Sequence, residues 1–212
     1  MLIWNNGVGK IKNDKYYIEI TRVHYKTFRE LVDNYEVVYD IILNPTNFDP
    51  VLYYPDVLSI AINYEKNTQK KVQNIYRLQK NIAIIGNLVS HADNDDGYFD
   101  VEVILEDDIL IVMMNDVLIV FECSTLSMVK HTELPGVVHY SIEQFDNGYI
   151  VHGECSIIKL TSDFDIEWTF DDADIFVTIN GECPFEIRGD TIHLCDFTGY
   201  KCVLDKFGKV IR

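Results

Sequence analysis

Residues 109–131 read ILIVMMNDVLIVFECSTLSMVKH, and this stretch indicates the fold of the chain. Its first two runs, Ile109–Val112 and Val117–Glu122, consist mostly of β-branched and large apolar residues, and Asn115-Asp116 separates them. A third run follows from Ser127 to His131. Short runs of this composition, bounded by turn-forming residues, are typical of antiparallel β-strands. The stretch therefore predicts three consecutive strands joined by short turns.

The same order of strands and turns recurs twice toward the C-terminus. The second copy comprises the runs Tyr149–His152, Ser156–Leu160 and Ile166–Phe170. The third copy comprises the runs Thr191–Cys195, Tyr200–Leu204 and Lys209–Ile211. The middle runs of the three copies end 39 and 44 residues apart, at Phe121, Leu160 and Leu204. One more strand candidate precedes each copy: Phe99–Leu105, Val137–Phe145, and either Phe176–Ile179 or Phe185–Ile187.

Four strands in about 40 residues form the repeat unit of a β-propeller blade. Over about 110 residues, this rhythm resembles the β-propeller repeats of WD40 and quinoprotein-like proteins, without the Trp-Asp and Gly-His signatures of WD40 blades. The resemblance implies an all-β, propeller-like fold of four-stranded repeats, and five blades of about 42 residues would occupy nearly the whole chain. It also implies that Leu2–Trp4 pairs with Lys209–Ile211 to close the ring. A β-sandwich is the alternative architecture.

The first 80 residues are less regular. Thr27 and Glu30 match a capping box, and apolar residues follow at helical spacing, so one short inserted helix is expected at 27–35. Strands are expected on either side of this helix, at 16–23 and 36–43.

No low-complexity linker divides the chain. A long loop is expected at 44–56, which holds three of the five prolines. The sequence predicts a single domain over 1–212, with an irregular half at 1–80 and an acidic repeat half at 81–212.

Charge is distributed unevenly between these halves. Residues 81–187 contain 22 Asp and Glu but only two cations, Lys130 and Lys159, whereas the first 80 residues contain 11 Lys and Arg against 9 acids. The whole chain has a net charge of −16. A field of one sign repels nucleic acid and anionic lipid, and it attracts cationic partners at long range. We therefore expect a basic protein partner and no binding to nucleic acid or membranes.

The expected cellular location of the protein and the redox state of its cysteines follow from simpler features. The N-terminus lacks a basic region followed by an apolar one, so no signal peptide is expected. The longest apolar run, Ile109–Met114, is too short to span a bilayer. The five cysteines are odd in number and contain no CxxC pair, which favours reduced thiols in a cytoplasmic protein.

The sequence does not match the following motifs for catalysis and metal binding. There is no G-x-S-x-G, G-x-G-x-x-G or Walker sequence. Placing Gly97 at position 6 of an EF-hand loop puts Ala92 at position 1 and Val103 at position 12, where oxygen ligands are required. The sequence therefore predicts no enzyme activity and no cofactor.

A zinc site is also not favoured. His152, Cys155, His193 and Cys195 occupy similar places in two repeats, but their local spacings are not those of zinc knuckles. Strand alternation would also point His152 and Cys155 to opposite faces. We expect no metal.

Candidate protein-binding residues are the carboxylates of two acidic segments and one aromatic residue next to the second segment: Asp93, Asp95, Asp96, Asp100, Asp107, Asp108, Trp168, Asp171, Asp172 and Asp174. Tyr and Trp are favoured anchors in protein interfaces, and carboxylates around them suit a Lys- or Arg-rich partner.

The leading hypothesis is an acidic cytosolic protein-binding module, such as an immunity protein that neutralises a basic nuclease toxin. One alternative is a small-molecule-binding or hydrolytic propeller-like protein. Another is a structural repeat module. In a third reading, the acidity serves solubility alone.

Overall fold

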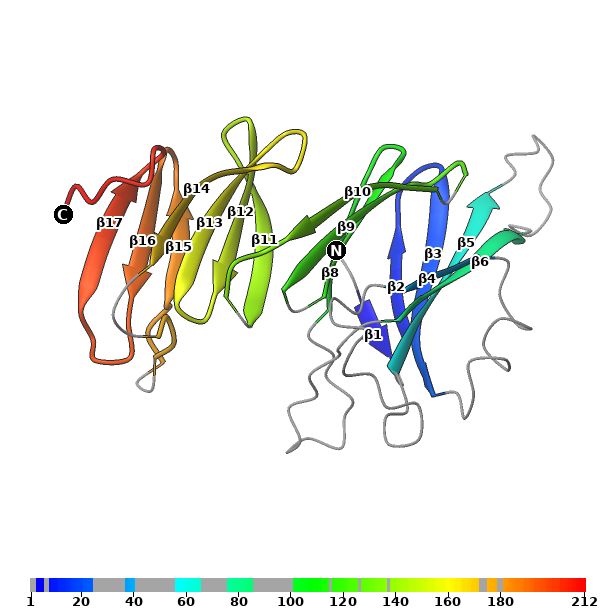
Figure 1. The fold of residues 1–212 in the computed structure, drawn as a ribbon, viewed down its shortest axis with the longest axis horizontal. Helices are drawn as coiled ribbons and strands as arrows, with labels where there is room; N and C mark the ends of the chain where they lie inside the picture. The colour runs from blue at the N-terminus through cyan, green and yellow to red at the C-terminus, as the bar shows by residue number, and fades with distance from the viewer. Residues whose placement is uncertain are drawn as a thin grey trace. The chain divides into compact units, whose positions relative to one another are not determined.

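The fold is all-β throughout the part of the chain that the computed structural model describes (Figure 1). The described residues are 3–5, 8–24, 37–40, 56–65, 76–85, 101–114, 116–125, 127–136, 138–171, 175–178 and 181–212. They contain 17 strands and no helix. The helix expected at 27–35 and nearly all of the loop expected at 44–56 lie outside these residues. The all-β prediction is confirmed.

The chain forms two compact units. Unit 1 consists of Met1–Met114 and Ile119–Val129, and unit 2 consists of Asn115–Leu118 and Lys130–Arg212. This division into compact units does not test the single domain expected over 1–212, which stays a prediction.

Unit 1 contains a six-stranded sheet whose strands run in the order β1-β2-β3-β5-β6-β4. The strands are β1 (Ile3–Asn5), β2 (Val8–Lys12), β3 (Tyr16–His24), β4 (Val37–Asp40), β5 (Asp56–Glu65) and β6 (Tyr76–Ile85). β4 pairs with β6 in parallel, and the other pairs in this sheet are antiparallel. A six-stranded sheet with a parallel pair differs from a propeller blade, so the count of five blades does not extend to these residues.

The second sheet has the strand order of a blade. Its order β10-β9-β8-β7 combines β7 (Val101–Glu106), β8 (Ile109–Met114), β9 (Val117–Glu122) and β10 (Ser127–Glu133). The bounds of β9 are those predicted, and β8 and β10 each extend their predicted run by two residues. The turn between β7 and β8 places Asp107 at a φ of 44°, a conformation that Asp tolerates better than most residues.

Unit 2 contains two further sheets, one of them a complete blade. The four-stranded sheet β11-β12-β13-β14 comprises β11 (His139–Phe145), β12 (Gly148–Gly153), β13 (Ser156–Thr161) and β14 (Ile166–Asp171). The three-stranded sheet comprises β15 (Phe185–Arg188), β16 (Thr191–Cys195) and β17 (Lys201–Asp205). Of the two candidates for the first strand of this last repeat, the run from Phe185 forms it.

The expected closure of a ring by the two chain ends is wrong. Trp4 of β1 pairs with Gly9 of β2. The C-terminal residues instead fold back along β17, where Val210 bridges Leu204 and the amide of Ile211 donates to the Val203 carbonyl at 2.8 Å. Each end finds a nearby partner, because a short connection loses less entropy than a long one.

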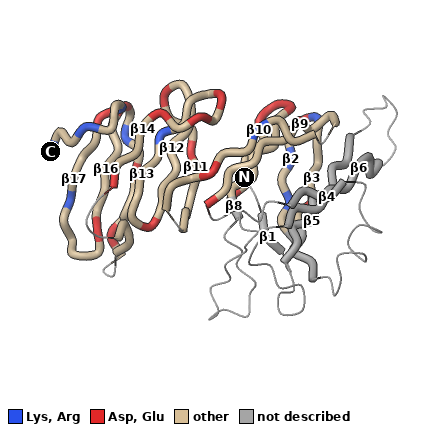
Figure 2. The backbone as a smooth tube through the Cα atoms, in the orientation of Figure 1, with Lys and Arg blue, Asp and Glu red and all other residues tan. Residues whose placement is uncertain are grey.

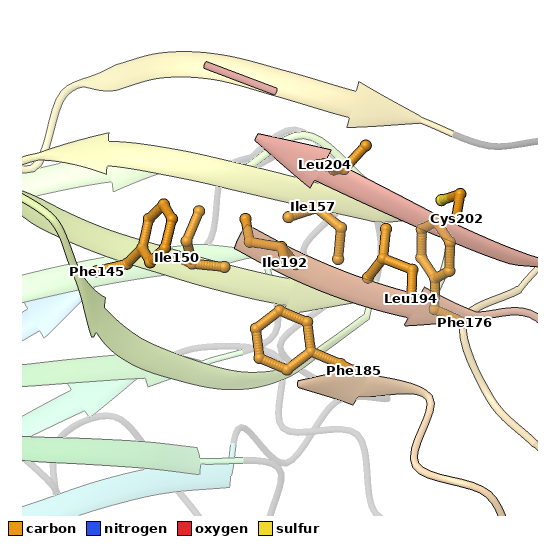
Figure 3. Close-up of a cluster of buried hydrophobic side chains, with 9 residues drawn as sticks. All are labelled: Phe145, Ile150, Ile157, Phe176, Phe185, Ile192, Leu194, Cys202 and Leu204. Carbon is orange, nitrogen blue, oxygen red and sulfur yellow. The ribbon is translucent and has the colours of Figure 1, made fainter. Parts of the chain in front are cut away.

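The core of unit 2 lies between its two sheets (Figure 3). Alternation along each strand sends every second side chain to this layer. The buried residues of the cluster are Phe145, Ile150, Ile157, Phe176, Phe185, Ile192, Leu194, Cys202 and Leu204. Trp168, Phe170 and Ile187 pack against them and are partly buried.

His152 extends this layer at the end of β12. Its ring stacks on Phe185 of β15 with centroids 4.8 Å apart, and Nε2 lies 3.2 Å from the Phe176 carbonyl oxygen. His152 as a whole is 5% exposed. Burial lowers the pKa of His152 to about 4, because the protonated ring would lose its hydration.

The stability of unit 2 is therefore expected to depend on His152 at acidic pH. The folded-state pKa of His152 lies below the ordinary value of 6.5. The contribution of His152 to the free energy of unfolding is therefore full above pH 6.5 and is lost as the pH falls toward 4. The loss amounts to about 3 kcal/mol. In a Trp4→Phe background, urea unfolding followed by Trp168 fluorescence measures this for wild type and His152→Phe, which keeps an aromatic ring. If wild type and His152→Phe lose equal stability between pH 7 and pH 4, the lowered pKa of His152 is not the cause of the loss.

Candidate protein-binding site

β14 is the outermost strand of its sheet and carries the acidic segment around Trp168. The sequence from Asp163 to Asp174 holds six carboxylates and no Lys or Arg. Within β14, Trp168 and Phe170 turn toward the core, whereas Glu167, Thr169 and Asp171 are exposed. Ile166 is also 42% exposed. The strand thus presents an acidic, accessible surface on an otherwise well-packed sheet.

The outer edge of β14 pairs with no other strand among the described residues. In the sheet order, β14 has β13 as its single neighbour. The corresponding edge of β17 is covered by the chain itself, since Val203 donates to the Arg212 carbonyl and Asp205 donates to the Lys209 carbonyl, both at 2.9 Å. Unpaired backbone donors and acceptors on a strand edge form a template for another strand.

A register shift marks the same strand. Lys159 of β13 is opposite Trp168 and Leu160 is opposite Ile166, so Glu167 is the extra residue of a β-bulge. Bulges re-aim side chains and often lie at sheet edges.

The two cations of the 81–187 region offset little of its charge. Lys159 is 2% exposed, and its ammonium group donates to the backbone carbonyls of Phe145 at 3.0 Å and Leu160 at 2.9 Å. Desolvation lowers the pKa of Lys159. Lys130 Nζ forms an ion pair with Asp165 Oδ1 at 2.5 Å. Figure 2 shows the acidic residues of unit 2 in red, and blue positions on β17 and toward the C-terminus.

Trp168 lies under the turn that follows β17. Its indole Nε1 donates to the Lys206 carbonyl at 3.1 Å, and a Cβ on Gly208 would come within 2.8 Å of ring atoms Cδ2 and Cε3. The ring is partly buried and packs against the core cluster. This geometry ties Trp168 to the stability of unit 2, so the role of an exposed anchor stays a prediction.

Asp107 and Asp108 lie apart from β14 in the chain, in the β7–β8 turn of unit 1. The Asp108 carboxylate pairs with the Lys15 ammonium and accepts a 2.5 Å hydrogen bond from the Tyr16 hydroxyl, and the Asn13 amide donates to the Asp107 carbonyl at 2.8 Å. The hydrogen bond from Lys15 is the main reason why the pKa of Asp108 is lowered. Asp108 therefore joins the β2–β3 turn to the β7–β8 turn.

The remaining predicted site residues are not described. Asp93, Asp95, Asp96, Asp100, Asp172 and Asp174 lie outside the described residues. Of the ten predicted binding residues, the structure brings Trp168 and Asp171 together on β14.

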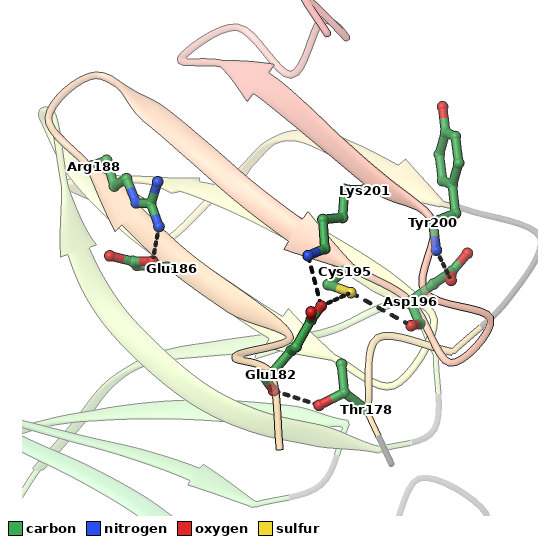
Figure 4. A network of polar contacts seen from close by, with 8 residues as sticks. All are labelled: Thr178, Glu182, Glu186, Arg188, Cys195, Asp196, Tyr200 and Lys201. Atoms are coloured by element: carbon green, nitrogen blue, oxygen red, sulfur yellow. Dashed lines mark hydrogen bonds and ion pairs between the residues drawn. The ribbon is translucent and has the colours of Figure 1, made fainter. Parts of the chain in front are cut away.

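A polar hollow on the β15–β17 sheet has no counterpart in the sequence analysis. It has a volume of about 470 Å³, and its lining includes Glu182, Glu186, Arg188, His193, Cys195 and Lys201. Two ion pairs are formed there, Lys201 to Glu182 at 2.7 Å and Arg188 to Glu186 at 2.6 Å (Figure 4). No linear motif relates these residues, because register alone sets β15 and β17 on either side of β16.

The thiol of Cys195 belongs to the same hollow. Its Sγ lies 3.5 Å from Glu182 Oε2, and burial, with this contact, raises its pKa. A raised pKa keeps the sulfur as a poorly nucleophilic thiol.

Metal-binding residues do not gather in the described part of the chain. No group of three or more His, Cys, Asp or Glu is arranged to hold an ion there. His193 Nε2 lies 3.2 Å from Thr191 Oγ1, whereas His152 contacts the Phe176 carbonyl. The five cysteines are present as thiols, with Cys155 and Cys183 exposed.

No helix among the described residues is long and apolar enough to cross a bilayer.

Comparisons with known proteins identify no family. No family model and no curated protein matches the chain. Among solved structures, BamB from Moraxella catarrhalis is similar with a TM-score of 0.41 and 16% identity, over 52% of this chain and 36% of BamB. Hsv2 from Kluyvelomyces marxianus is similar with a TM-score of 0.30 and 8% identity, over 74% of this chain and 60% of Hsv2. Both TM-scores are low, so the blade-like description rests on the strand pairing given above.

The packing of Gly208 on Trp168 is expected to be essential for unit 2. Gly208→Ala adds a methyl group against the ring at a φ of +75°, whereas Gly199→Ala adds one at a φ of +86° with nothing within 4 Å. We expect Gly199→Ala to cost about 1 kcal/mol and Gly208→Ala about 2 kcal/mol or more. Urea unfolding measures both, and Trp168 fluorescence should change only in Gly208→Ala. Equal costs with unchanged fluorescence would show that the turn does not hold the indole.

Proposed function

We propose that this chain is a protein-binding module that captures a basic protein partner through the β14 edge. The observation that carries the proposal is the combination of an open strand edge with exposed Glu167 and Asp171. Carboxylates already paired within the fold, such as Asp108, have less charge to offer a partner.

The kind of partner follows from charge. Exposed carboxylates at an interface rim raise association rates with cationic proteins, and like-charged molecules are rejected. A cationic nuclease toxin, neutralised in the cytosol by an acidic immunity protein, fits this requirement. Asp172 and Asp174 continue the same acidic segment in the sequence.

Charge reversal on β14 is expected to slow capture of a basic partner. The double variant Glu167→Lys/Asp171→Lys is compared with Glu143→Lys/Asp190→Lys, which changes the same charge at exposed positions away from β14. Stopped-flow association with a panel of cationic nuclease domains from secreted toxins should be slowed about tenfold or more in the first variant at low salt. The difference should shrink as salt screens the charges.

Two results would contradict the proposal. If no nuclease domain binds, or if none is inhibited when bound, the immunity role is wrong. If both double variants associate at the same rate, β14 is not the binding surface.

A second candidate function is the binding of a small polar molecule in the hollow on β15–β17. Its volume of about 470 Å³ lies in the range of ligand pockets, and carboxylates and cations converge on it. Groups of both signs suit a zwitterionic ligand, such as an amino acid or the end of a peptide.

This second candidate predicts ligand-dependent stability. Free amino acids and short peptides should raise the melting temperature of the wild type, because a ligand that binds only the folded state stabilises it. Lys201→Met should lose the increase, and Lys209→Met, which is outside the lining, should keep it. Absence of any increase, or equal increases in both variants, would exclude this function of the hollow.

A further inference from the structure

We infer that the basic partner binds by adding an extended segment of its own chain to β14, as a fifth strand of the β11–β14 sheet. This inference rests on the proposed function and names the mode of binding and the chemistry of the segment: extended, with Lys or Arg at alternate positions.

The backbone of β14 supplies the first argument. Among the described residues β14 pairs with β13 alone, and its side chains Ile166, Glu167, Thr169 and Asp171 are exposed along the strand. A strand of six residues spans about 20 Å, which is long enough for several main-chain hydrogen bonds to an added strand. Main-chain bonds of this kind supply affinity, and side chains at alternate positions supply specificity.

Unit 2 itself shows what covers such an edge. Residues 209–212 run along β17 and form backbone hydrogen bonds with Val203 and Asp205. An extended segment therefore completes the three-stranded sheet, where the chain supplies its own. On β14 the described residues supply none.

The side chains decide which segment fits. Asp171 lies at the end of β14, Glu167 lies at its bulge, and Asp163 precedes the strand; all three are exposed. Opposite charges on neighbouring strands attract, and like charges directly opposite each other repel. An added strand with cations at alternate positions satisfies these carboxylates while its backbone pairs with β14.

The same charges argue against a second copy of this chain as the occupant. Two β14 strands placed edge to edge would bring Glu167 and Asp171 of each copy close to those of the other. Charged residues on edge strands are a common protection against self-association. The acidic edge therefore repels a second copy of this chain and accepts a basic strand.

The test uses the full chain and a peptide of about eight residues with alternating Arg and Val, a length that matches β14. Two control peptides carry backbone N-methyl groups, one on every Arg and one on every Val. All three have the same charge and side chains, but each N-methylated form loses the amide donors on one edge. Fluorescence anisotropy measures affinity, and hydrogen exchange measures protection of amides in 166–171.

We expect the parent peptide to bind, to slow exchange in 166–171, and to bind at least tenfold more tightly than at least one N-methylated form. Glu167→Gln/Asp171→Asn should weaken binding of the parent peptide, whereas Glu143→Gln/Asp190→Asn should not. Equal affinity of all three peptides, or no protection of 166–171, would overturn strand addition.

The outcomes also separate this inference from the proposed function. If cationic nuclease domains bind in a β14-dependent manner without protecting 166–171, the function stands and strand addition is wrong. If 166–171 is protected without peptide and the chain is dimeric at the same concentration, a second copy covers the edge and the inference is overturned. If neither the nuclease domains nor the peptide binds, both proposals fail.

Discussion

The apolar layer between the β11–β14 and β15–β17 sheets holds unit 2 together, and the other features of this unit depend on it. Each sheet contributes alternate side chains to the layer, with Ile150 and Ile157 from one sheet and Ile192 and Leu204 from the other. Burial of such side chains stabilises a fold by about 25 cal/mol for each Å² of apolar surface removed from water. Because a shift of one residue would send the wrong face inward, this layer also sets the register of every strand in it.

Polar groups at the margin of this layer follow from the register. The ammonium group of Lys159 reaches two backbone carbonyls, and His152 stays neutral between Tyr140 and Phe185. Buried polar groups are tolerated when such partners are present. With Lys159 inside, one of the two cations of the acidic region is withdrawn from the surface, and the exposed charge of this region is more negative than its composition indicates.

The treatment of strand edges connects the fold to the proposed function. The chain covers β17 with its own C-terminal residues and leaves β14 with a row of backbone groups facing outward in the described structure. An open edge is an aggregation risk unless charge protects it. In the proposed function, the carboxylates protect β14 from other acidic chains and also attract a basic one. Protection and recognition would then be two consequences of one electrostatic arrangement.

Local patterns were sufficient to predict the described strands of the repeat half. β9 and β16 have the predicted bounds, and β13 is one residue longer than its predicted run, because a run of β-branched residues between turn formers specifies a strand without help from distant residues. Closure between the chain ends was wrong, because it depended on a pairing over more than 200 residues. The six-stranded sheet of unit 1, with its parallel β4–β6 pair, was likewise not anticipated.

For the candidate site the division is similar. The sequence by itself determined the acidic segment and the strand run Ile166–Phe170, which contains Trp168. Only the tertiary structure decided that Trp168 lies beneath the turn at Gly208, that Asp108 pairs with Lys15, and that the β15–β17 sheet carries a polar hollow. The reason is physical: alternation and turn preference depend on neighbouring residues, whereas these contacts join segments whose proximity is set by sheet register and packing.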